Sequence, residues 1–225
     1  MRKGNGIIHL RDMISKLPPE KAREVIKEFY DDAYELGYYN PNNSFLQWQN
    51  VIDAAPHSLF QKGLDIGCGV GRGIKYAVEK GYEAYGCDIS KNIGKFWKDL
   101  SISERCRVCP ATDLPYEDGE FDLVLCMDVL EHIPEYDIHD AISEMERVGS
   151  RLFIVAVALV DERQPVAKRI TTHITIRSAS WWKEQFRKVG IQIRVDGEKN
   201  DHWWFYGLKR GIEGLIYTRE GSANE

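Results

Sequence analysis

Two carboxylates and an imidazole stand close together in the middle of the chain. In the stretch Asp128-Val129-Leu130-Glu131-His132, the side chains of Asp128, Glu131 and His132 are at positions i, i+3 and i+4. On a helical turn this spacing would put all three on one face. They could then bind a divalent metal ion, or an acid could adjust the pKa of His132 so that it acts as a general base. A cap and an ion pair at the start of a helix would use the same residue types.

A glycine-rich turn is the second place where residue types and spacing indicate chemistry. The short apolar run Leu64-Asp65-Ile66 is followed by glycines at alternate positions from Gly67 to Gly73. Glycine can adopt positive φ and lets a ligand approach the backbone closely. The spacing does not fit the G-x-G-x-x-G fingerprint of dinucleotide-binding proteins. Asp65 would also repel a pyrophosphate, whereas it would attract the ammonium group of S-adenosylmethionine, which contains no phosphate.

This glycine-rich stretch resembles the first motif of class I S-adenosylmethionine-dependent methyltransferases. Asp88 ends the next predicted strand, about 20 residues further on, where a carboxylate can accept hydrogen bonds from both ribose hydroxyls. By the resemblance, Asp113 would bind the adenine amino group, and Ile89 and Leu114 would enclose the ring. A nicotinamide-dependent enzyme would need the same ribose acid, but Asp65 and the Asp113-Leu114 loop favour S-adenosylmethionine. The cofactor-binding residues predicted in this way are Asp65, Gly67, Cys68, Gly69, Gly71, Asp88, Ile89, Thr112, Asp113, Leu114 and Met127.

His173 is a further candidate for the part of the site that would bind the molecule to be methylated. It precedes an amphipathic, tryptophan-containing segment, and this arrangement resembles two groups of methyltransferases: those of glycan and natural-product clusters, and the metal-dependent small-RNA 2′-O-methyltransferases. In the second group a downstream histidine completes a metal site. By that resemblance the candidate ligands of a divalent ion such as magnesium, manganese or zinc are Asp128, Glu131, His132 and His173, with aspartate where the family motif has glutamate. Without a metal ion, His132 and then His173 are the candidate bases or substrate-positioning residues.

A regular alternation of strand and helix patterns begins at Gly63 and must position these residues. The predicted strands cover 62–66, 82–87, 105–109, 121–126, 150–157, 191–195 and 202–208, and the helices between them cover 71–80, 90–100, 135–148 and 178–189. Such alternation is typical of parallel βαβ units, and the turn-rich segment 197–200 predicts a hairpin between the last two strands. The pattern looks like the methyltransferase fold, an α/β architecture: a seven-stranded, mostly parallel Rossmann-like sheet with one antiparallel strand and helices on both faces.

Two helices are expected ahead of this sheet. One begins at Pro18-Pro19 and ends near Gly37, with apolar residues at helical spacing, and the second covers 44–55. By the resemblance they form a cap over the cofactor, with Tyr30 and Tyr38 as lid residues. The predicted organisation is an N-terminal helical extension or cap over 1–57, a class I methyltransferase domain over 58–210 and a C-terminal tail over 211–225.

Composition and charge limit the classes of partner. The 225 residues carry a formal net charge of -5, which argues against a broad nucleic-acid-binding face. No apolar run is long enough to span a bilayer and no signal peptide follows Met1, so we expect a cytoplasmic protein without a membrane anchor. Cys106 and Cys109 have no second pair of the same spacing, so we expect reduced, mostly buried thiols rather than a zinc ribbon.

These residues together predict an S-adenosylmethionine-dependent methyltransferase. The expected reaction is direct, in-line methyl transfer to an oxygen of a small molecule or a sugar or glycan precursor, with His132 or His173 as base. N- or C-methylation is left open. The alternatives are a metal-dependent RNA 2′-O-methyltransferase-like enzyme and a non-catalytic S-adenosylmethionine-binding module. The polar segment 158–172 is expected to be a substrate lid, and strand alternation should bury one of Trp203 and Trp204.

Overall fold

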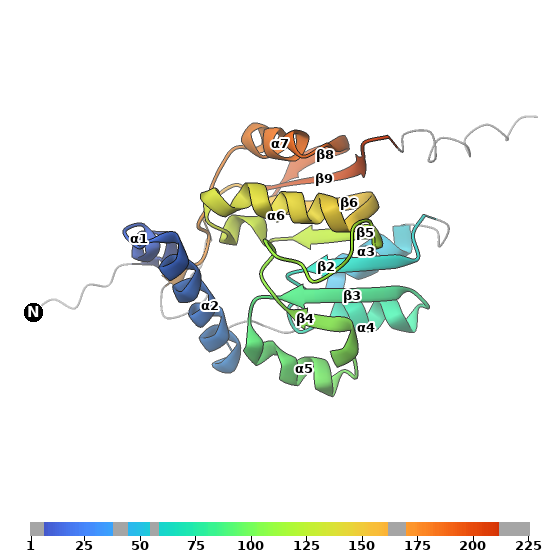
Figure 1. Cartoon of the computed structure of the whole chain (residues 1–225), viewed down its shortest axis with the longest axis horizontal. Helices are drawn as coiled ribbons and strands as arrows, with labels where there is room; N and C mark the ends of the chain where they lie inside the picture. Colours follow the sequence, from blue (N-terminus) through green and yellow to red (C-terminus); the bar gives the residue numbers. More distant parts are fainter. Residues whose placement is uncertain (1–6, 38–44, 55–58, 162–169, 212–225) are drawn as a thin grey trace, which may run out of the picture.

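The computed structural model describes residues 7–37, 45–54, 59–161 and 170–211. Within these ranges, one large sheet contains β2 (Lys62–Ile66), β3 (Glu83–Asp88), β4 (Cys106–Val108), β5 (Phe121–Met127), β6 (Gly149–Ala158), β8 (Ile191–Lys199) and β9 (His202–Lys209). The seven strands follow the order β4-β3-β2-β5-β6-β9-β8 (Figure 1). Neighbouring strands run parallel except where β9 pairs with β6 and β8. The predicted mostly parallel sheet with one antiparallel strand is therefore confirmed.

Helices cover both faces of this sheet. One face carries α6 (Glu135–Val148) and α7 (Ala179–Lys188), and the other carries α3 (Phe45–Ala54), α4 (Arg72–Glu79) and α5 (Gly94–Asp99). Because both faces are covered, β5 is apolar on both: Val124 packs with α6 and α7, whereas Leu123 and Leu125 pack with α3, α4 and α5. In β9, Trp203 is fully buried and Trp204 is 40% exposed, which confirms the predicted alternation. Among the described residues, no helix has the length and apolar character needed to cross a membrane.

Trp48 of α3 accounts for two glycines of the sequence. A Cβ at Gly63 would lie 2.8 Å from the Trp48 ring, and a Cβ at Gly73 would lie 2.3 Å from it. The indole is fully buried, and its Nε1 donates a hydrogen bond to Oδ2 of Asp65 at 2.8 Å. Gly63 of β2 therefore allows α3 to pack closely against the sheet, and Gly73 allows it to pack closely against α4, which is a structural reason for the last glycine of the run.

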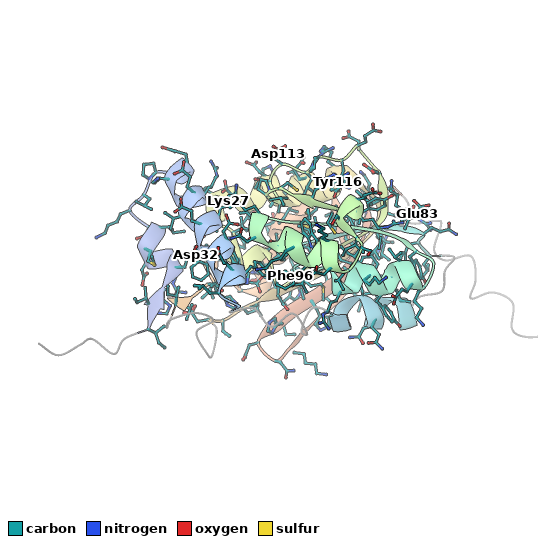
Figure 2. The ribbon with its side chains drawn as sticks, turned by 90° about the horizontal axis from the view of Figure 1, so that it is seen from below. Lys27, Asp32, Glu83, Phe96, Asp113 and Tyr116 are labelled. Carbon is teal, nitrogen blue, oxygen red and sulfur yellow. The ribbon has the colours of Figure 1, made fainter. Side chains whose placement is uncertain are left out.

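An N-terminal segment lies at the carboxyl ends of β2, β3 and β5 (Figure 1). It consists of β1 (Ile8–His9), α1 (Leu10–Ile14) and α2 (Pro19–Glu35), and β1 pairs in parallel with β7 (Ile170–Thr171). The sequence before Pro18 had no pattern that indicated β1 or α1, because this pairing joins segments far apart in the chain. In Figure 2, Lys27 and Asp32 of α2 lie at the opposite end of the molecule from Glu83, which begins β3.

Two polar contacts hold α2 in this place. Asp31 accepts hydrogen bonds from Ser90 Oγ and from the backbone N–H of Lys91, both at 2.8 Å. Arg23 donates to the two carboxylate oxygens of Asp137 at 2.6 and 2.9 Å. Both aspartates are buried, and charge-assisted hydrogen bonds of this kind are among the stronger ones in proteins. α2 is therefore tied to the turn after β3 and to α6.

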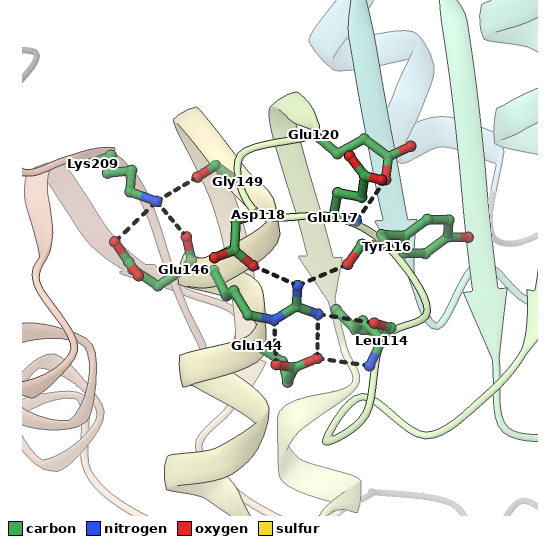
Figure 3. Close-up of polar contacts among 10 residues, drawn as sticks. Leu114, Tyr116, Glu117, Asp118, Glu120, Glu144, Glu146, Gly149 and Lys209 are labelled. Carbon is green, nitrogen blue, oxygen red and sulfur yellow. Dashed lines mark hydrogen bonds and ion pairs between the residues drawn. The ribbon is translucent and has the colours of Figure 1, made fainter.

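The loop that follows β4 is held against α6 by Arg147. Its guanidinium group donates to the carbonyl oxygens of Leu114 and Tyr116 at 2.9 and 2.7 Å, and to the Glu144 carboxylate at 2.6 Å (Figure 3). Glu144 in turn accepts the N–H of Leu114 at 2.8 Å. With both backbone groups bound to α6, Leu114 packs its side chain into the main hydrophobic core, where it is 3% exposed.

The hairpin between β8 and β9 turns later than the sequence predicts. Residues 197–199 belong to β8, and the turn consists of Asn200 and Asp201, which have positive φ values of 54° and 66°. Such a two-residue turn with positive φ matches the right-handed twist of the strands. Gly197 has a different reason to be glycine, because a Cβ there would lie 2.9 Å from the Trp204 ring. The predicted position of the turn at 197–200 is therefore wrong.

Candidate active site

A cavity of about 490 Å³ opens at the carboxyl edge of the sheet, next to α2. Its wall combines one side of α2 with the turns that follow β2, β3, β4 and β5, and it includes Tyr30, Gly67, Asp88, Thr112 and His132. Most of the exposed area of its wall is apolar, although several charged and polar side chains also line it. A cavity of this size and character is typical of a site for a small organic ligand.

The glycine-rich turn after β2 needs glycine for two reasons. Gly67, Gly69 and Gly71 all have positive φ, between 53° and 80°. In addition, a Cβ at Gly67 would lie 2.3 Å from Val129 Cγ2, and a Cβ at Gly71 would lie 2.4 Å from Ile102 Cδ1. The turn therefore fits closely between its neighbours. Of the predicted cofactor residues in this turn, Gly67 lines the cavity, and Cys68, Gly69 and Gly71 do not.

Asp88 ends β3 at the cavity wall. Its Oδ2 accepts the N–H of Gly69 at 3.1 Å, and its Oδ1 accepts the N–H of Ser90 at 3.0 Å. Burial raises the pKa of Asp88 to about 6. Because each carboxylate oxygen has more than one acceptor position, Asp88 can still accept hydrogen bonds from the hydroxyls of a ligand in the cavity.

Asp65 is a second buried acid near the turn, and burial raises its pKa to about 7. Its Oδ2 accepts the indole N–H of Trp48, and the side chain is not part of the cavity wall. Burial disfavours the charged form of a carboxyl group, and a nearby cation favours that form and lowers the pKa again. The environment of Asp65 therefore suits a neighbouring ammonium group.

The predicted adenine contacts divide into two groups. Ile89 and Thr112 line the cavity. Asp113 is exposed at the surface (Figure 2), and Leu114 is packed in the core, so the structure brings neither of them to the wall. Residues 108–111 line the cavity instead, and the sequence reasoning missed them. Their position at the carboxyl end of a predicted strand was the signal that could have indicated them.

The turn after β5 differs from the predicted helical turn. Asp128 has a positive φ of 56°, and the 3₁₀ segment η3 (Leu130–His132) begins only afterwards. The N–H of Asp128 donates to the carbonyl of Ala156 at 2.9 Å, so strand pairing with β6 extends to this residue. The prediction that Asp128, Glu131 and His132 share one face of a helical turn is therefore wrong. Asp128 and His132 line the cavity, whereas Glu131 and Met127 do not.

Glu131 lies at the centre of the residues predicted to be catalytic or metal-binding, and its side chain is fully buried. One carboxylate oxygen lies within 4.8 Å of a ring nitrogen of His132 and of His173, and the same carboxylate forms a second such group with Asp128 and His202. The structure therefore brings the four predicted candidates together, but in two groups that share Glu131. No motif indicated His202, because only the antiparallel pairing of β9 with β6 brings it here.

The two predicted histidines have fixed ring orientations. His132 Nδ1 lies 3.1 Å from the carbonyl oxygen of Thr172, and His173 Nδ1 lies 2.7 Å from that of Val160. Because a carbonyl oxygen only accepts, each Nδ1 carries the proton and each Nε2 carries the lone pair. Burial, together with the neighbouring His173, lowers the pKa of His132 to about 3, so this ring is neutral at neutral pH.

α1 and α2 contribute further groups near His132 and His173. Tyr30 lines the cavity and meets the His132 ring edge-on, with 6.1 Å between ring centroids. Asp161, from the predicted lid segment, accepts two hydrogen bonds from Arg11 at 2.6 Å each. Tyr38 and residues 162–169, which include the other charged residues of that segment, lie outside the described residues.

The residues around this cavity match a known protein family. Residues 64–152 match the model of the family described as “Methyltransferase domain”. The fold of the chain is the Rossmann-like fold of S-adenosylmethionine-dependent methyltransferases of known structure. The residues that match the family model run from β2 into β6, so they include the glycine-rich turn, Asp88 and the turn after β5.

Curated relatives of this protein include enzymes named for different acceptors. The chloroplastic tocopherol O-methyltransferase of Arabidopsis thaliana is 30% identical over 175 residues, which cover 60% of this chain and 50% of that protein. The ajmaline N-methyltransferase of Rauvolfia serpentina is 30% identical over 162 residues, which cover 57% of this chain and 55% of that protein. The chain therefore spans about half the length of the curated relatives it matches.

Among solved structures, the 1,6-didemethyltoxoflavin-N1-methyltransferase of Burkholderia thailandensis is similar to this protein over 85% of this chain and 90% of that chain. The TM-score is 0.66 and the sequence identity is 14%. That structure contains 1,6-didemethyltoxoflavin and S-adenosylhomocysteine. At this identity the likeness shows the shared fold alone.

Proposed function

We propose that this protein transfers the methyl group of S-adenosylmethionine to a small molecule that binds at the His132 end of the cavity. The observation that carries this proposal is that one cavity extends from Asp88 to Asp128 and His132. The names of two relatives, a tocopherol O-methyltransferase and an ajmaline N-methyltransferase, also describe small-molecule acceptors. The acceptor we favour is a hydroxyl group of a small molecule or of a sugar or glycan precursor.

The cofactor would lie along the glycine-rich turn. The Asp88 carboxylate would accept the ribose hydroxyls, because backbone N–H groups already hold its two oxygens in place. The amino acid end would lie toward Asp65, whose charged form a cation favours. The adenine would lie between Ile89 and residues 108–112, which line the same wall. This arrangement would direct the sulfonium methyl group toward the turn after β5.

Methyl transfer would proceed by in-line attack of the acceptor oxygen on the sulfonium methyl group. The new oxygen–carbon bond forms while the carbon–sulfur bond breaks, and the electron pair of that bond stays on sulfur, which leaves neutral S-adenosylhomocysteine. The hydroxyl proton passes to a base. His132 is our first candidate, because it lines the cavity and its Nε2 carries the lone pair. His173 is the second, with 5.0 Å between the two ring centroids.

The test combines binding with turnover. Calorimetry should show that Asp88→Ala weakens S-adenosylhomocysteine binding at least about tenfold, because hydrogen bonds to a charged group are lost. Asp99→Ala, which removes an exposed carboxylate at the end of α5, is the matched control and should bind normally. With methyl-labelled S-adenosylmethionine, a small-molecule fraction should take up label, and His132→Ala should lower the rate about 10²–10⁴-fold.

Other outcomes would count against specific parts of the proposal. Unchanged S-adenosylhomocysteine affinity in Asp88→Ala would contradict the placement of the cofactor. Label found in RNA rather than in small molecules would favour the RNA 2′-O-methyltransferase-like alternative. Tight cofactor binding without transfer to any fraction would favour the non-catalytic binding module.

A further inference from the structure

The two groups of ligand-type side chains around Glu131 differ in composition. One group joins the Glu131 carboxylate to the imidazoles of His132 and His173, and the other joins it to Asp128 and His202. In each group the donor atoms lie within 4.8 Å of one another. Only the first group contains the histidines that the sequence motifs indicated. The sequence therefore gives no reason for the position of His202 in the second group.

Strand pairing places His202 next to Glu131. His202 is opposite Ala158 in the β6–β9 ladder, and the N–H of Ala158 donates to Glu131 Oε1 at 2.9 Å. The register of β9 against β6 therefore determines where His202 lies along the sheet. The imidazole and the carboxylate are therefore positioned by the same residue of β6, on rigid elements rather than on a long loop.

The ring of His202 has the orientation of a metal ligand. Its Nδ1 lies 2.8 Å from the carbonyl oxygen of Asn200, so Nδ1 is the protonated nitrogen of the neutral ring, in which Nε2 carries the lone pair. Nε2 lies 3.5 Å from Oδ1 of Asp128. Histidines that bind metals commonly donate their other ring N–H to a backbone carbonyl in this way, which determines the tautomer and the ring orientation.

Charge and access favour this second group over the first. The second group supplies two carboxyl groups and an imidazole, a set that can balance the charge of a divalent cation when it binds, whereas the first group contains one carboxyl group. The side chains of Asp128 and His202 are 47% and 41% exposed, so a hydrated ion can reach them. Glu131, by contrast, is fully buried and would anchor the ion from the protein side.

We propose that Asp128, Glu131 and His202 bind one divalent metal ion, of the class of Mn²⁺ or Zn²⁺. Carboxylate oxygens with an imidazole nitrogen form a mixed ligand set that suits these ions. The site differs from the set indicated by sequence resemblance, because His202 replaces His132 and His173. Those two histidines then remain available to the methyl acceptor.

A role of this ion in catalysis rests on the proposed function. Binding of the ion by the three side chains does not depend on that function. Asp128 lines the same cavity as His132, so the ion would lie beside the acceptor. There it would hold the acceptor oxygen and lower the pKa of its hydroxyl group. The partly exposed ligands would leave coordination positions open for that oxygen.

The test measures metal binding directly. Protein freed of metal with a chelator is titrated with Mn²⁺, followed by electron paramagnetic resonance, and with Zn²⁺, followed by calorimetry. The wild type should bind one equivalent, and Asp128→Asn and His202→Ala should each weaken binding at least about tenfold. His139→Ala, which removes an exposed histidine of α6, is the matched control and should bind like the wild type. S-adenosylhomocysteine binding, measured without metal, should be the same in the wild type, His202→Ala and His139→Ala, because neither histidine is part of the cavity wall.

Three results would overturn the proposal. One is wild-type metal affinity in His202→Ala, and another is no binding by the wild type at millimolar metal. The third is binding that His173→Ala abolishes and His202→Ala leaves intact, which would place the ion in the first group. Because cofactor binding is measured separately, failure of the metal site is distinguishable from failure of the proposed function. Wild-type turnover by metal-free enzyme would overturn the catalytic role of the ion.

Discussion

At the scale of single residues, Asp88 should couple cofactor binding to pH. Burial raises its pKa to about 6, so the carboxyl group of the ligand-free protein is largely protonated below that pH. Hydrogen bonds from ribose hydroxyls favour the charged form, so binding below the pKa must release a proton. We expect S-adenosylhomocysteine affinity, measured by calorimetry, to rise with pH through about 6, by up to about tenfold per pH unit, and then to level off.

Asp88→Asn is the matched variant, because it keeps the size of the side chain and removes its ionisation. It should bind more weakly than the wild type above pH 6 and lack the step near that pH. Any step that remains near pH 7 would come from Asp65, whose pKa burial raises to about 7. A step of wild-type size near pH 6 in Asp88→Asn would show that another group is responsible.

At the scale of elements, α2 borders the cavity, and Asp31 holds α2 in place. Asp31→Ala removes the acceptor of the Ser90 hydroxyl and of the Lys91 N–H. We expect the free energy of unfolding, measured in denaturant, to fall by about 1–3 kcal/mol, because buried donors lose their partner. S-adenosylhomocysteine affinity should fall as well, because α2 supplies one side of the cavity wall.

Asp32→Ala is the control for this prediction. Asp32 is the next residue of α2 but is exposed (Figure 2), so its removal tests the change of charge and of helix propensity alone. The free energy of unfolding and the S-adenosylhomocysteine affinity of Asp32→Ala should stay close to those of the wild type. Equal losses of stability and affinity in both variants would mean that the negative charge of α2, and not the Asp31 hydrogen bonds, holds the helix in place.

At the scale of the whole molecule, Asp65 links stability to pH. Its pKa is about 7 in the folded protein and close to 3.8 in the unfolded chain. A raised folded-state pKa contributes stability that is fully present below the unfolded pKa and is lost as the pH rises through the folded pKa. Between pH 5 and pH 8, the wild-type free energy of unfolding should therefore fall by about 2–3 kcal/mol more than that of Asp65→Asn.

Asparagine at position 65 keeps an acceptor for the Trp48 indole, so packing should be preserved. We expect Asp65→Asn to be more stable than the wild type at pH 8 and to bind S-adenosylhomocysteine more weakly, a trade between stability and function. Thermal unfolding and calorimetry on the same samples measure both. Equal pH dependence in the two proteins would show that Asp65 does not ionise in this range.

The sequence by itself determined most of the elements and the positions of the glycine-rich turn and of Asp88 at the ends of their strands, because these depend on local patterns. Alternating apolar strands and amphipathic helices have their own periodicity, so α6 was predicted at 135–148 and found at Glu135–Val148. The glycine-rich turn and Asp88 were predictable for the same reason, because a few neighbouring residues are enough to indicate positive φ and the carboxyl end of a strand.

Only the tertiary structure decided which side chains reach the cavity and how the acceptor side is assembled. Leu114 was directed into the core by hydrogen bonds to α6, and Gly73 was explained by the Trp48 ring. His202 joins Glu131 through the pairing of β9 with β6, and β1 joins β7. These contacts connect residues that are distant in the chain, so no local period or motif contains them. Their positions follow from sheet order and close packing, which exist only once the chain has folded.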